Sequence, residues 1–383
     1  LSLAMTKLLF NLERTQPTAT VKRHGGGIYG EIVFKRIVER NLPVEAVYDS
    51  SKWFNPELER LCQEKEIPLH DLASGKSMQQ FVNETGAEVF YTPLQLPELA
   101  RLTGCRIVST IHGLRDLELP ADKFAFRYKT NFRGNVKQLL FTLFPKKWKQ
   151  HKWNGIQAYF ENDAVRYVTV SEQSKSSIQL FFPRQRRNRI NVFYSPCTAT
   201  VVPALEKRHD KYFLLVSGNR WEKNNLRAII ALDRLYTDGI ISDTKTVVTG
   251  VRNASVFRYR LRNPDKFEFP GYVDDDQLAA LYRDAYCFIY PTLNEGFGYP
   301  PLEAMRFGVP VLASPVTSVA EICGDGALYF NPYDIEEMQM RIIRVLNSDY
   351  HKELSSLGLK RFAAVKSRQE ADLDMLIDYI YNS

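Results

Sequence analysis

Two glutamates flank a glycine-rich turn in the stretch 290–310, which reads YPTLNEGFGYPPLEAMRFGVP. Glu295 lies on the turn, and Glu303 follows eight positions later in a helix whose first residues suit the two prolines. Gly296 and Gly298 let backbone approach a ligand closely, and the start of the helix offers unpaired N–H groups to an anion. The stretch therefore suits a ligand that carries both hydroxyls and phosphates, such as a nucleotide sugar.

A simpler interpretation treats both acids as solvated groups near a helix N-terminus, where the helix dipole stabilises them. This interpretation accounts for Glu303. It gives no reason for Gly-Phe-Gly beside Glu295, directly after a buried apolar strand, because a plain loop has no need of that backbone freedom. The sequence therefore favours a ligand site.

The elements that must position this stretch form two series of alternating strands and helices. The first series has strands at 7–11, 44–48, 88–92, 106–111, 167–170 and 190–194, and helices at 25–40, 56–65 and 172–181. The second has strands at 212–217, 244–249, 267–269, 287–290, 309–313 and 327–330, and helices at 225–236, 276–285 and 335–347. Such alternation predicts an α/β protein with parallel, doubly wound sheets that bind ligands at the carboxyl ends of their strands.

The length of 383 residues and the repeat of this pattern predict two Rossmann-like domains facing across a cleft. We expect the first at 5–195 and the second at 204–365, joined by a linker at 195–203 that contains two prolines. A C-terminal helix within 366–383 follows the second domain and can cross back to the first.

The amino-acid composition indicates the cellular compartment in which we expect the protein. A hydrophobic content of 44% with 25% charged residues describes a soluble globular protein. Five scattered cysteines argue for a reducing compartment and against a disulfide framework or a zinc site. No apolar run approaches the roughly 20 residues that span a bilayer. We expect residues 1–4 to be foreign to the protein, no signal peptide, and a cytoplasmic location.

The net charge of +7 is concentrated in segment 123–153. This segment holds nine lysines and arginines, no acidic residue and eight aromatic residues, which leaves a net charge of −2 for the rest of the chain. Apolar residues recur in it at helical spacing: Val136, Leu139, Leu140, Leu143 and Phe144. An apolar stripe edged by Trp and Lys suits an anionic membrane surface, and a helix packed on its own domain is the alternative. No nucleic-acid module accompanies the basic residues, so no nucleic-acid partner is expected.

The stretch YPTLNEGFGYPPLEAMRFGVPVLAS resembles the E-x7-E signature of retaining glycosyltransferases of the GT-B fold, most closely glycosyltransferase family 4. VSGNRWEKNNLRAIIAL (216–232) resembles the phosphate-contacting segment of that family, and FEFPGYVDDDQLAALYRDAYCFIYP (267–291) its base-contacting loop and the helix after it. VTVSEQSKSSI (168–178) and STIHGL (109–114) resemble elements of its first domain. The resemblance covers the second domain nearly throughout and the first in patches.

The resemblance implies roles for residues of the second domain. Glu303 would hold the ribose hydroxyls of the donor, and Glu295 the hydroxyls of its sugar. Backbone N–H groups from Gly296 to Gly298, with Phe297 between them, would face the sugar and the diphosphate. Val273 would lie in the base-contacting loop.

The resemblance also implies two cations and a first-domain contribution. Arg220 and Lys223 would neutralise the leaving diphosphate, so no metal and no cofactor are expected, although Asn-Asn after Lys223 departs from the usual pattern of the family. Two solvated surface charges are the alternative. His112 matches the histidine that contacts the donor sugar, and with Glu295 it is a candidate catalytic residue. Gly26 and Gly27 match a glycine-rich loop that closes over diphosphate and acceptor.

Two other motifs in the sequence suggest different chemistry. GGGIYG at 25–30 matches the dinucleotide fingerprint G-x-G-x-x-G, with Asp49 about 20 residues further on. Residues 12–24 separate these glycines from the first strand, so we favour the transferase over an NAD-dependent oxidoreductase. Asp274-Asp275-Asp276 contains a D-x-D string, which can hold a metal, but its place before a helix favours an N-cap.

We therefore expect a retaining, metal-independent glycosyltransferase of the hexosyltransferase type. It would move a sugar from a nucleotide-sugar donor, UDP- or GDP-linked, to a glycan or a lipid-phosphate-linked acceptor. The expected setting is cell-surface polysaccharide assembly, with the enzyme peripheral on the inner face of the cell membrane through segment 123–153. A GT-B-like protein that binds sugar nucleotides without transferring them is the alternative.

Overall fold

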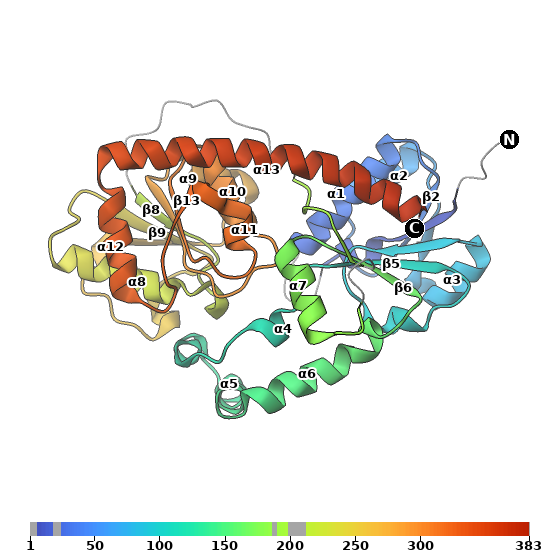
Figure 1. The fold of residues 1–383 in the computed structure, drawn as a ribbon, viewed down its shortest axis with the longest axis horizontal. Coiled ribbons are helices and arrows are strands. Elements are labelled where there is room, and N and C mark those ends of the chain that lie inside the picture. The colour runs from blue at the N-terminus through green and yellow to red at the C-terminus, as the bar shows by residue number, and fades with distance from the viewer. Residues whose placement is uncertain (1–5, 18–23, 186–189, 198–211, 383) are drawn as a thin grey trace. The chain divides into compact units, whose positions relative to one another are not determined.

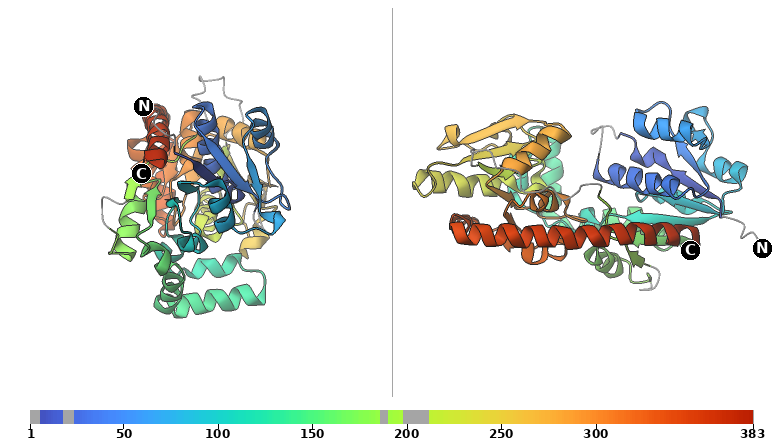
Figure 2. Two further views of the ribbon diagram at one scale, coloured as in Figure 1. Left: turned by 90° about the vertical axis from the view of Figure 1, so that its right-hand side faces the viewer. Right: turned by 90° about the horizontal axis from the view of Figure 1, so that it is seen from above.

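The computed structural model describes residues 6–17, 24–185, 190–197 and 212–382. The chain forms two compact units, each assembled from separate parts of the sequence. Unit 1 comprises Leu1–Leu114, Trp153–Thr198 and Lys366–Ser383, and unit 2 comprises Arg115–Lys152 and Ala199–Val365. Each unit contains one parallel sheet with helices on both of its faces (Figures 1 and 2). The predicted α/β class is confirmed.

The sheet of unit 1 has seven parallel strands in the order β3-β2-β1-β4-β5-β6-β7. The strands are β1 Leu8–Asn11, β2 Val44–Tyr48, β3 Leu69–Asp71, β4 Val89–Thr92, β5 Arg106–Ile111, β6 Val165–Thr169 and β7 Ile190–Val192. Central strands such as β1 and β4 are buried along their whole length, because helices cover both faces of the sheet. Its helices are α1 Gly25–Glu39, α2 Pro56–Glu64, α3 Met78–Thr85 and α7 Glu172–Phe181.

The sheet of unit 2 has six parallel strands in the order β10-β9-β8-β11-β12-β13. The strands are β8 Tyr212–Leu215, β9 Lys245–Thr249, β10 Phe267–Gly271, β11 Cys287–Tyr290, β12 Val311–Ala313 and β13 Ala327–Tyr329. From β8 the chain builds the sheet in one direction, and from β11 it builds in the other. The point between β8 and β11 is therefore the switch point of the sheet, where such folds bind ligands.

The helices of unit 2 include α4 Arg115–Glu118, α5 Phe132–Leu143, α8 Asn225–Thr237, α9 Asp275–Asp284, α10 Tyr299–Arg306, α11 Val319–Cys323 and α12 Ile335–Val345. Two further helices continue from unit 2 into unit 1: α6 Pro145–Phe160 and α13 Ser348–Asn382. In the described ranges, no helix combines the length and the apolar character needed to cross a membrane.

The division into units differs from the predicted boundaries in one place. The sequence placed segment 123–153 in the first domain, whereas Arg115–Lys152 packs within unit 2. A buried ion pair between Asp122 and Arg227 on α8 holds this part of the chain there. Part of the predicted linker, 198–203, lies outside the described residues.

The C-terminal helix is longer than predicted. The sequence predicted a helix within 366–383, but α13 runs without a break from Ser348 to Asn382. Its residues from Lys366 onward belong to unit 1. There the backbone N–H of Tyr194 donates to Asp372 Oδ2 at 2.7 Å, and Tyr381 Oη donates to the carbonyl oxygen of Pro43 at 2.9 Å.

Candidate functional site

Two loops meet at the switch point of the unit 2 sheet. One follows β8 and comprises residues 216–224, and the other follows β11 and comprises residues 291–298. Their backbones are joined directly, since the N–H of Leu293 donates to the carbonyl oxygen of Glu222 at 2.8 Å. The predicted cations and the predicted turn acid lie on these two loops.

Lys223 and Glu295 form a buried ion pair across the switch point. Lys223 Nζ lies 2.5 Å from Glu295 Oε1, and the two side chains are only 6% and 10% exposed. The same Nζ donates to Tyr290 Oη at 2.9 Å, and Thr292 Oγ1 donates to Glu295 Oε1 at 2.8 Å. The alternative of a solvated surface charge is therefore wrong for Lys223.

The environment keeps Glu295 ionised. Burial alone would raise the pKa of this carboxyl, but the charge of Lys223 and hydrogen bonds from Lys223, Tyr290 and Thr292 outweigh burial and lower the pKa. A fixed carboxylate in a buried place can accept hydrogen bonds from the hydroxyls of a sugar.

Arg220 occupies the same loop and is more open to solvent. Its Nε and Nη2 donate to Glu222 Oε1 at 2.9 and 2.6 Å, and its side chain is 40% exposed. A second arginine, Arg115 at the start of α4, places Nη1 3.5 Å from the same carboxylate oxygen. Arg115 was not predicted as part of the site, because it lies far from Glu222 in the sequence.

The turn between β11 and α10 has the predicted form. Gly298 has φ +116°, a conformation that L side chains rarely adopt, and it precedes the first residue of α10. Ser318 Oγ donates to the carbonyl oxygens of Phe297 and Glu295 at 2.8 and 3.1 Å, which fixes the backbone on either side of Gly296. The N–H of Glu295 donates to Thr317 Oγ1 at 2.9 Å. The acid, glycines and helix start thus form one rigid turn.

Glu303 lies on α10, as predicted, with Arg306 Nε 3.1 Å from its Oε2. Burial raises the pKa of Glu303, and the charge of Arg306 offsets this effect only in part. Val273 is half-buried in the loop between β10 and α9. Asp274, next in sequence, forms a capping box with Gln277 at the start of α9, so the acidic run serves as the predicted N-cap.

His112 follows β5 in unit 1. Its Nε2 lies 2.9 Å from the carbonyl oxygen of Pro93, which can only accept, so Nε2 carries the proton and Nδ1 is an acceptor. Burial lowers the pKa of His112 to about 4, against the opposing effect of this hydrogen bond. The ring packs edge-on against the ring of Tyr29 on α1, with 4.7 Å between the two ring centroids. His112 is therefore a neutral acceptor at pH 7.

Gly26 and Gly27 lie in the first turn of α1 rather than in a loop ahead of it. The N–H of Gly27 donates to His24 Nδ1, which caps the helix, at 3.0 Å. A Cβ on Gly27 would lie 2.8 Å from the carbonyl oxygen of Thr15, and one on Gly26 would collide with the Leu94 side chain. Close packing at the helix start thus requires small residues here, whatever else they contact.

Asp49 has local partners at the end of β2. Its Oδ1 accepts from the N–H of Ser51 at 3.0 Å, and its Oδ2 pairs with Lys52 Nζ at 3.2 Å. The carboxylate that a dinucleotide fingerprint would assign to a ribose thus closes the turn after the strand.

Comparison with known proteins finds similarity mainly in the second half of the chain. Residues 198–358 match the family described as Glycosyl transferases group 1. The chain is 44% identical over 227 residues to O-antigen chain mannosyltransferase B of Escherichia coli, covering 52% of this chain and 60% of that protein. It is 30% identical over 178 residues to O-antigen chain mannosyltransferase RfbU of Salmonella typhimurium, covering 46% and 49%. The matched region thus spans at most 60% of the length of these two curated relatives.

Similarity of structure extends over the whole chain. The crystal structure of Anabaena Alr3699/HepE in complex with UDP and glucose matches with a TM-score of 0.68 and 14% identity. The match covers 98% of this chain and 99% of that one. At this identity the likeness shows the fold, which is the predicted GT-B architecture of two Rossmann-like α/β domains.

Proposed function

We propose that this chain is a glycosyltransferase that moves a mannosyl group from a nucleoside diphosphate to a growing cell-surface polysaccharide. The observation that carries the proposal is the buried pair of Lys223 and Glu295 at the switch point, beside a rigid glycine turn. A cation and a carboxylate in that place suit a diphosphate joined to a sugar. The match of 198–358 to the glycosyltransferase family and the two mannosyltransferase relatives support the class and the sugar.

The reaction we propose retains the configuration of the sugar and needs no metal. The bond between the anomeric carbon and the diphosphate oxygen breaks, and the acceptor oxygen bonds to the same carbon on the same face. The proton of the acceptor hydroxyl passes to the departing diphosphate oxygen, so no side chain has to take it. Lys223 and Arg220 stabilise the negative charge of the leaving group, and this effect is greatest where water is excluded.

Glu295 and His112 hold and orient the donor in this proposal. The ionised Glu295 accepts hydrogen bonds from sugar hydroxyls while Lys223 keeps it charged. His112, neutral and with Nδ1 as an acceptor, suits a hydroxyl group better than a phosphate. Neither residue is required as the proton carrier.

A thermal-shift screen with mannose linked to GDP, UDP, ADP and dTDP tests the proposal. One donor should raise the unfolding temperature more than the others at equal concentration, because it binds the folded protein most tightly, and the same donor should yield a transferred product. No shift with any of them would contradict a sugar-nucleotide site. A shift without transfer to any glycan or lipid-linked acceptor would instead support the non-catalytic binding protein.

Glu303→Gln is expected to weaken binding of the nucleotide about tenfold, because an amide accepts ribose hydroxyls less strongly than a carboxylate. Burial raises the pKa of the free wild-type Glu303, and hydroxyl donors favour its ionised form. Wild-type affinity should therefore rise with pH and level off above this raised pKa. Titration calorimetry with GDP and UDP from acidic to neutral pH measures both effects.

Glu303→Gln should bind the nucleotide more weakly, and its affinity should no longer depend on the ionisation of residue 303. Glu336→Gln on α12, which removes an exposed carboxylate paired with Arg234, is the control and should bind as wild type. Equal affinity of Glu303→Gln and wild type at every pH would remove Glu303 from the site.

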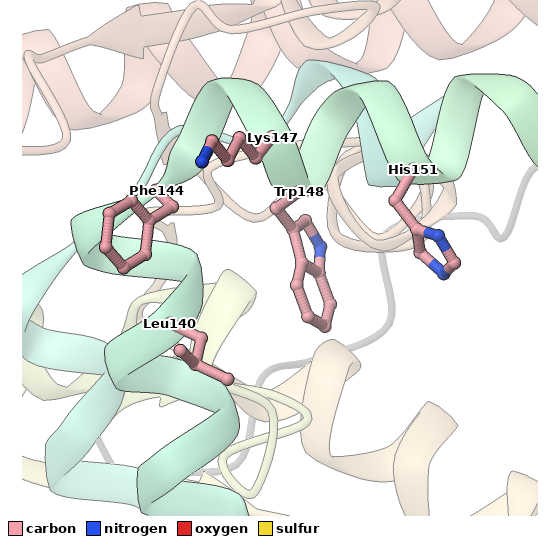
Figure 3. Close-up of a pocket in the computed structure, with 5 residues that line it drawn as sticks. All are labelled: Leu140, Phe144, Lys147, Trp148 and His151. Carbon is pink, nitrogen blue, oxygen red and sulfur yellow. The ribbon is translucent and has the colours of Figure 1, made fainter.

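We also propose that α5 and the start of α6 contact an anionic membrane, where a lipid-phosphate-linked acceptor would lie. α5 exposes several of its apolar residues, with Phe132 81% and Leu143 59% exposed, while Gln138 and Phe141 are buried. The adjoining residues Leu140, Phe144, Lys147, Trp148 and His151 line an open hollow of about 350 Å³ (Figure 3). Apolar side chains surrounded by lysines, in a segment without acids, suit anionic lipid headgroups.

Leu139→Ser combined with Leu143→Ser is expected to reduce binding to anionic vesicles severalfold, because both apolar side chains are exposed on α5. Flotation with phosphatidylglycerol-containing vesicles at low and high salt measures it. Met340→Ser with Ile343→Ser, two exposed apolar residues of α12, is the matched control. No wild-type flotation at low salt, or equal loss in both double variants, would contradict the membrane surface.

A further inference from the structure

Residues Arg115–Tyr128, here called the 115–128 segment, end about 70 positions before the main part of unit 2, Ala199–Val365, yet they are bonded to it. Arg227 Nη1 and Nη2 of α8 donate to the two carboxylate oxygens of Asp122 at 2.6 and 2.9 Å, and both side chains are buried. The guanidinium of Arg227 also stacks over Phe124 at 3.9 Å. Tyr128 Oη accepts from the N–H of Leu226 at 2.9 Å. A bidentate, buried pair of this kind fixes geometry.

The other end of the segment lies against the two loops at the switch point. Arg115 Nη1 is 3.5 Å from Glu222 Oε1, on the loop after β8. Glu118 Oε2 accepts from Asn294 Nδ2 at 2.6 Å, on the loop after β11. Glu222 and Asn294 directly precede Lys223 and Glu295 in the sequence. α4 is thus attached on either side of the buried pair.

The ion pairs of this cluster are unevenly shared. Three cations, Arg115, Arg220 and Lys223, pair with two carboxylates, those of Glu222 and Glu295. The carboxylate of Glu118 accepts from the neutral amide of Asn294. Both arginines contact the single carboxylate of Glu222, and their side chains are 44% and 40% exposed. The 3.5 Å contact of Arg115 is longer than the roughly 2.7–3.2 Å of an ordinary N–H···O bond, so it holds this guanidinium loosely. Two half-exposed guanidinium groups thus share one carboxylate oxygen, and a diphosphate would give each of them a further anionic partner.

We propose that Arg115 is a third cation of the donor site and contacts the diphosphate, and that the 115–128 segment positions it there. The inference rests on the proposed function, since it assumes a nucleoside diphosphate at the switch point. A guanidinium with several N–H donors in one plane is suited to phosphate oxygens. Glu222 orients both arginines, and the ion pair of Asp122 with Arg227 anchors the segment that carries Arg115.

Arg115→Gln tests the inference by calorimetric titration with GDP and UDP, and with guanosine and uridine. The variant should bind the diphosphate that wild type prefers about five- to tenfold more weakly, a modest effect because Arg115 is half exposed. Binding of the nucleoside should not change, because it has no phosphate. Arg115→Lys should retain part of the affinity, since the charge remains and the planar fork is lost.

Arg234→Gln is the matched control, because Arg234 is also 44% exposed and paired with a glutamate of unit 2. It should bind both nucleoside and diphosphate as wild type does. Unchanged diphosphate binding by Arg115→Gln would overturn the inference and leave the proposed function standing. So would an equal loss for nucleoside and diphosphate, which would indicate a general structural role. Failure of wild type to bind either diphosphate would overturn both.

Discussion

Glu295→Gln is expected to lower kcat at saturating donor by about a hundredfold or more, because it removes a charge that acts on two partners in a buried site. The substitution weakens the hydrogen bonds that hold the sugar. It also leaves Lys223 without its counterion 2.5 Å away. Burial and the nearby Arg220 already lower the pKa of Lys223, and the charge of Glu295 opposes them. Without Glu295, part of the positive charge at the leaving group is lost.

Steady-state kinetics with the preferred mannose donor measure this effect, and calorimetry with the nucleoside diphosphate separates it from donor binding. Binding of the diphosphate should fall much less than kcat, since the sugar contact is absent from that ligand. The double variant of Glu295→Gln with Lys223→Met should lose less than the sum of the two single losses in free energy, because the partners act on each other. A wild-type kcat for Glu295→Gln would exclude the carboxylate from the reaction.

Asp122→Ala is expected to destabilise unit 2 by about 3–5 kcal/mol, since it leaves the Arg227 guanidinium buried without a partner. Removing Arg227 as well, by Asp122→Ala with Arg227→Met, should restore much of the stability because no unpaired charge remains. Hydrogen exchange of peptides from the 115–128 segment and from α8 reports on this unit separately from the rest of the chain.

Asp116→Ala is the control for this loss of stability. Asp116 lies in the same segment and pairs with Lys152 at 2.7 Å, but its side chain is 63% exposed, so its removal should cost less than about 1 kcal/mol. If Asp122→Ala leaves exchange protection unchanged, the segment is held by contacts other than this ion pair.

The sequence was sufficient for most strands of the two sheets and for the chemistry of the turn. Runs such as CFIY and RIVSTI, buried in parallel sheets, fixed β11 and β5 at their observed bounds. The glycines around Phe297 and the prolines after them predicted the turn and the helix start. These are local signals, carried by residues close together in the chain. Short elements without such a signal, among them β3, α3, α4 and α11, were not predicted.

The contacts between distant parts of the chain could not be predicted from the sequence. That Lys223 meets Glu295 depends on β8 lying beside β11, and the order of strands in a sheet is a property of the whole domain. Arg115 and Asp122 find partners more than a hundred positions away, at Glu222 and Arg227. The basic segment was assigned to the first domain for the same reason, because its composition says nothing of which sheet it packs on.

The ion pair of Asp122 with Arg227 has a consequence for how the protein is made. The ribosome completes the 115–128 segment long before α8 is made. Asp122, Phe124 and Tyr128 therefore stay without their α8 partners until about a hundred further residues have been synthesised. Unit 1 is completed later still, because it includes the last turns of α13. Neither unit can therefore complete its contacts when its first residues are made. A fragment limited to the family match, 198–358, would retain Arg227 and lack Asp122, so the buried guanidinium would lose its carboxylate partner.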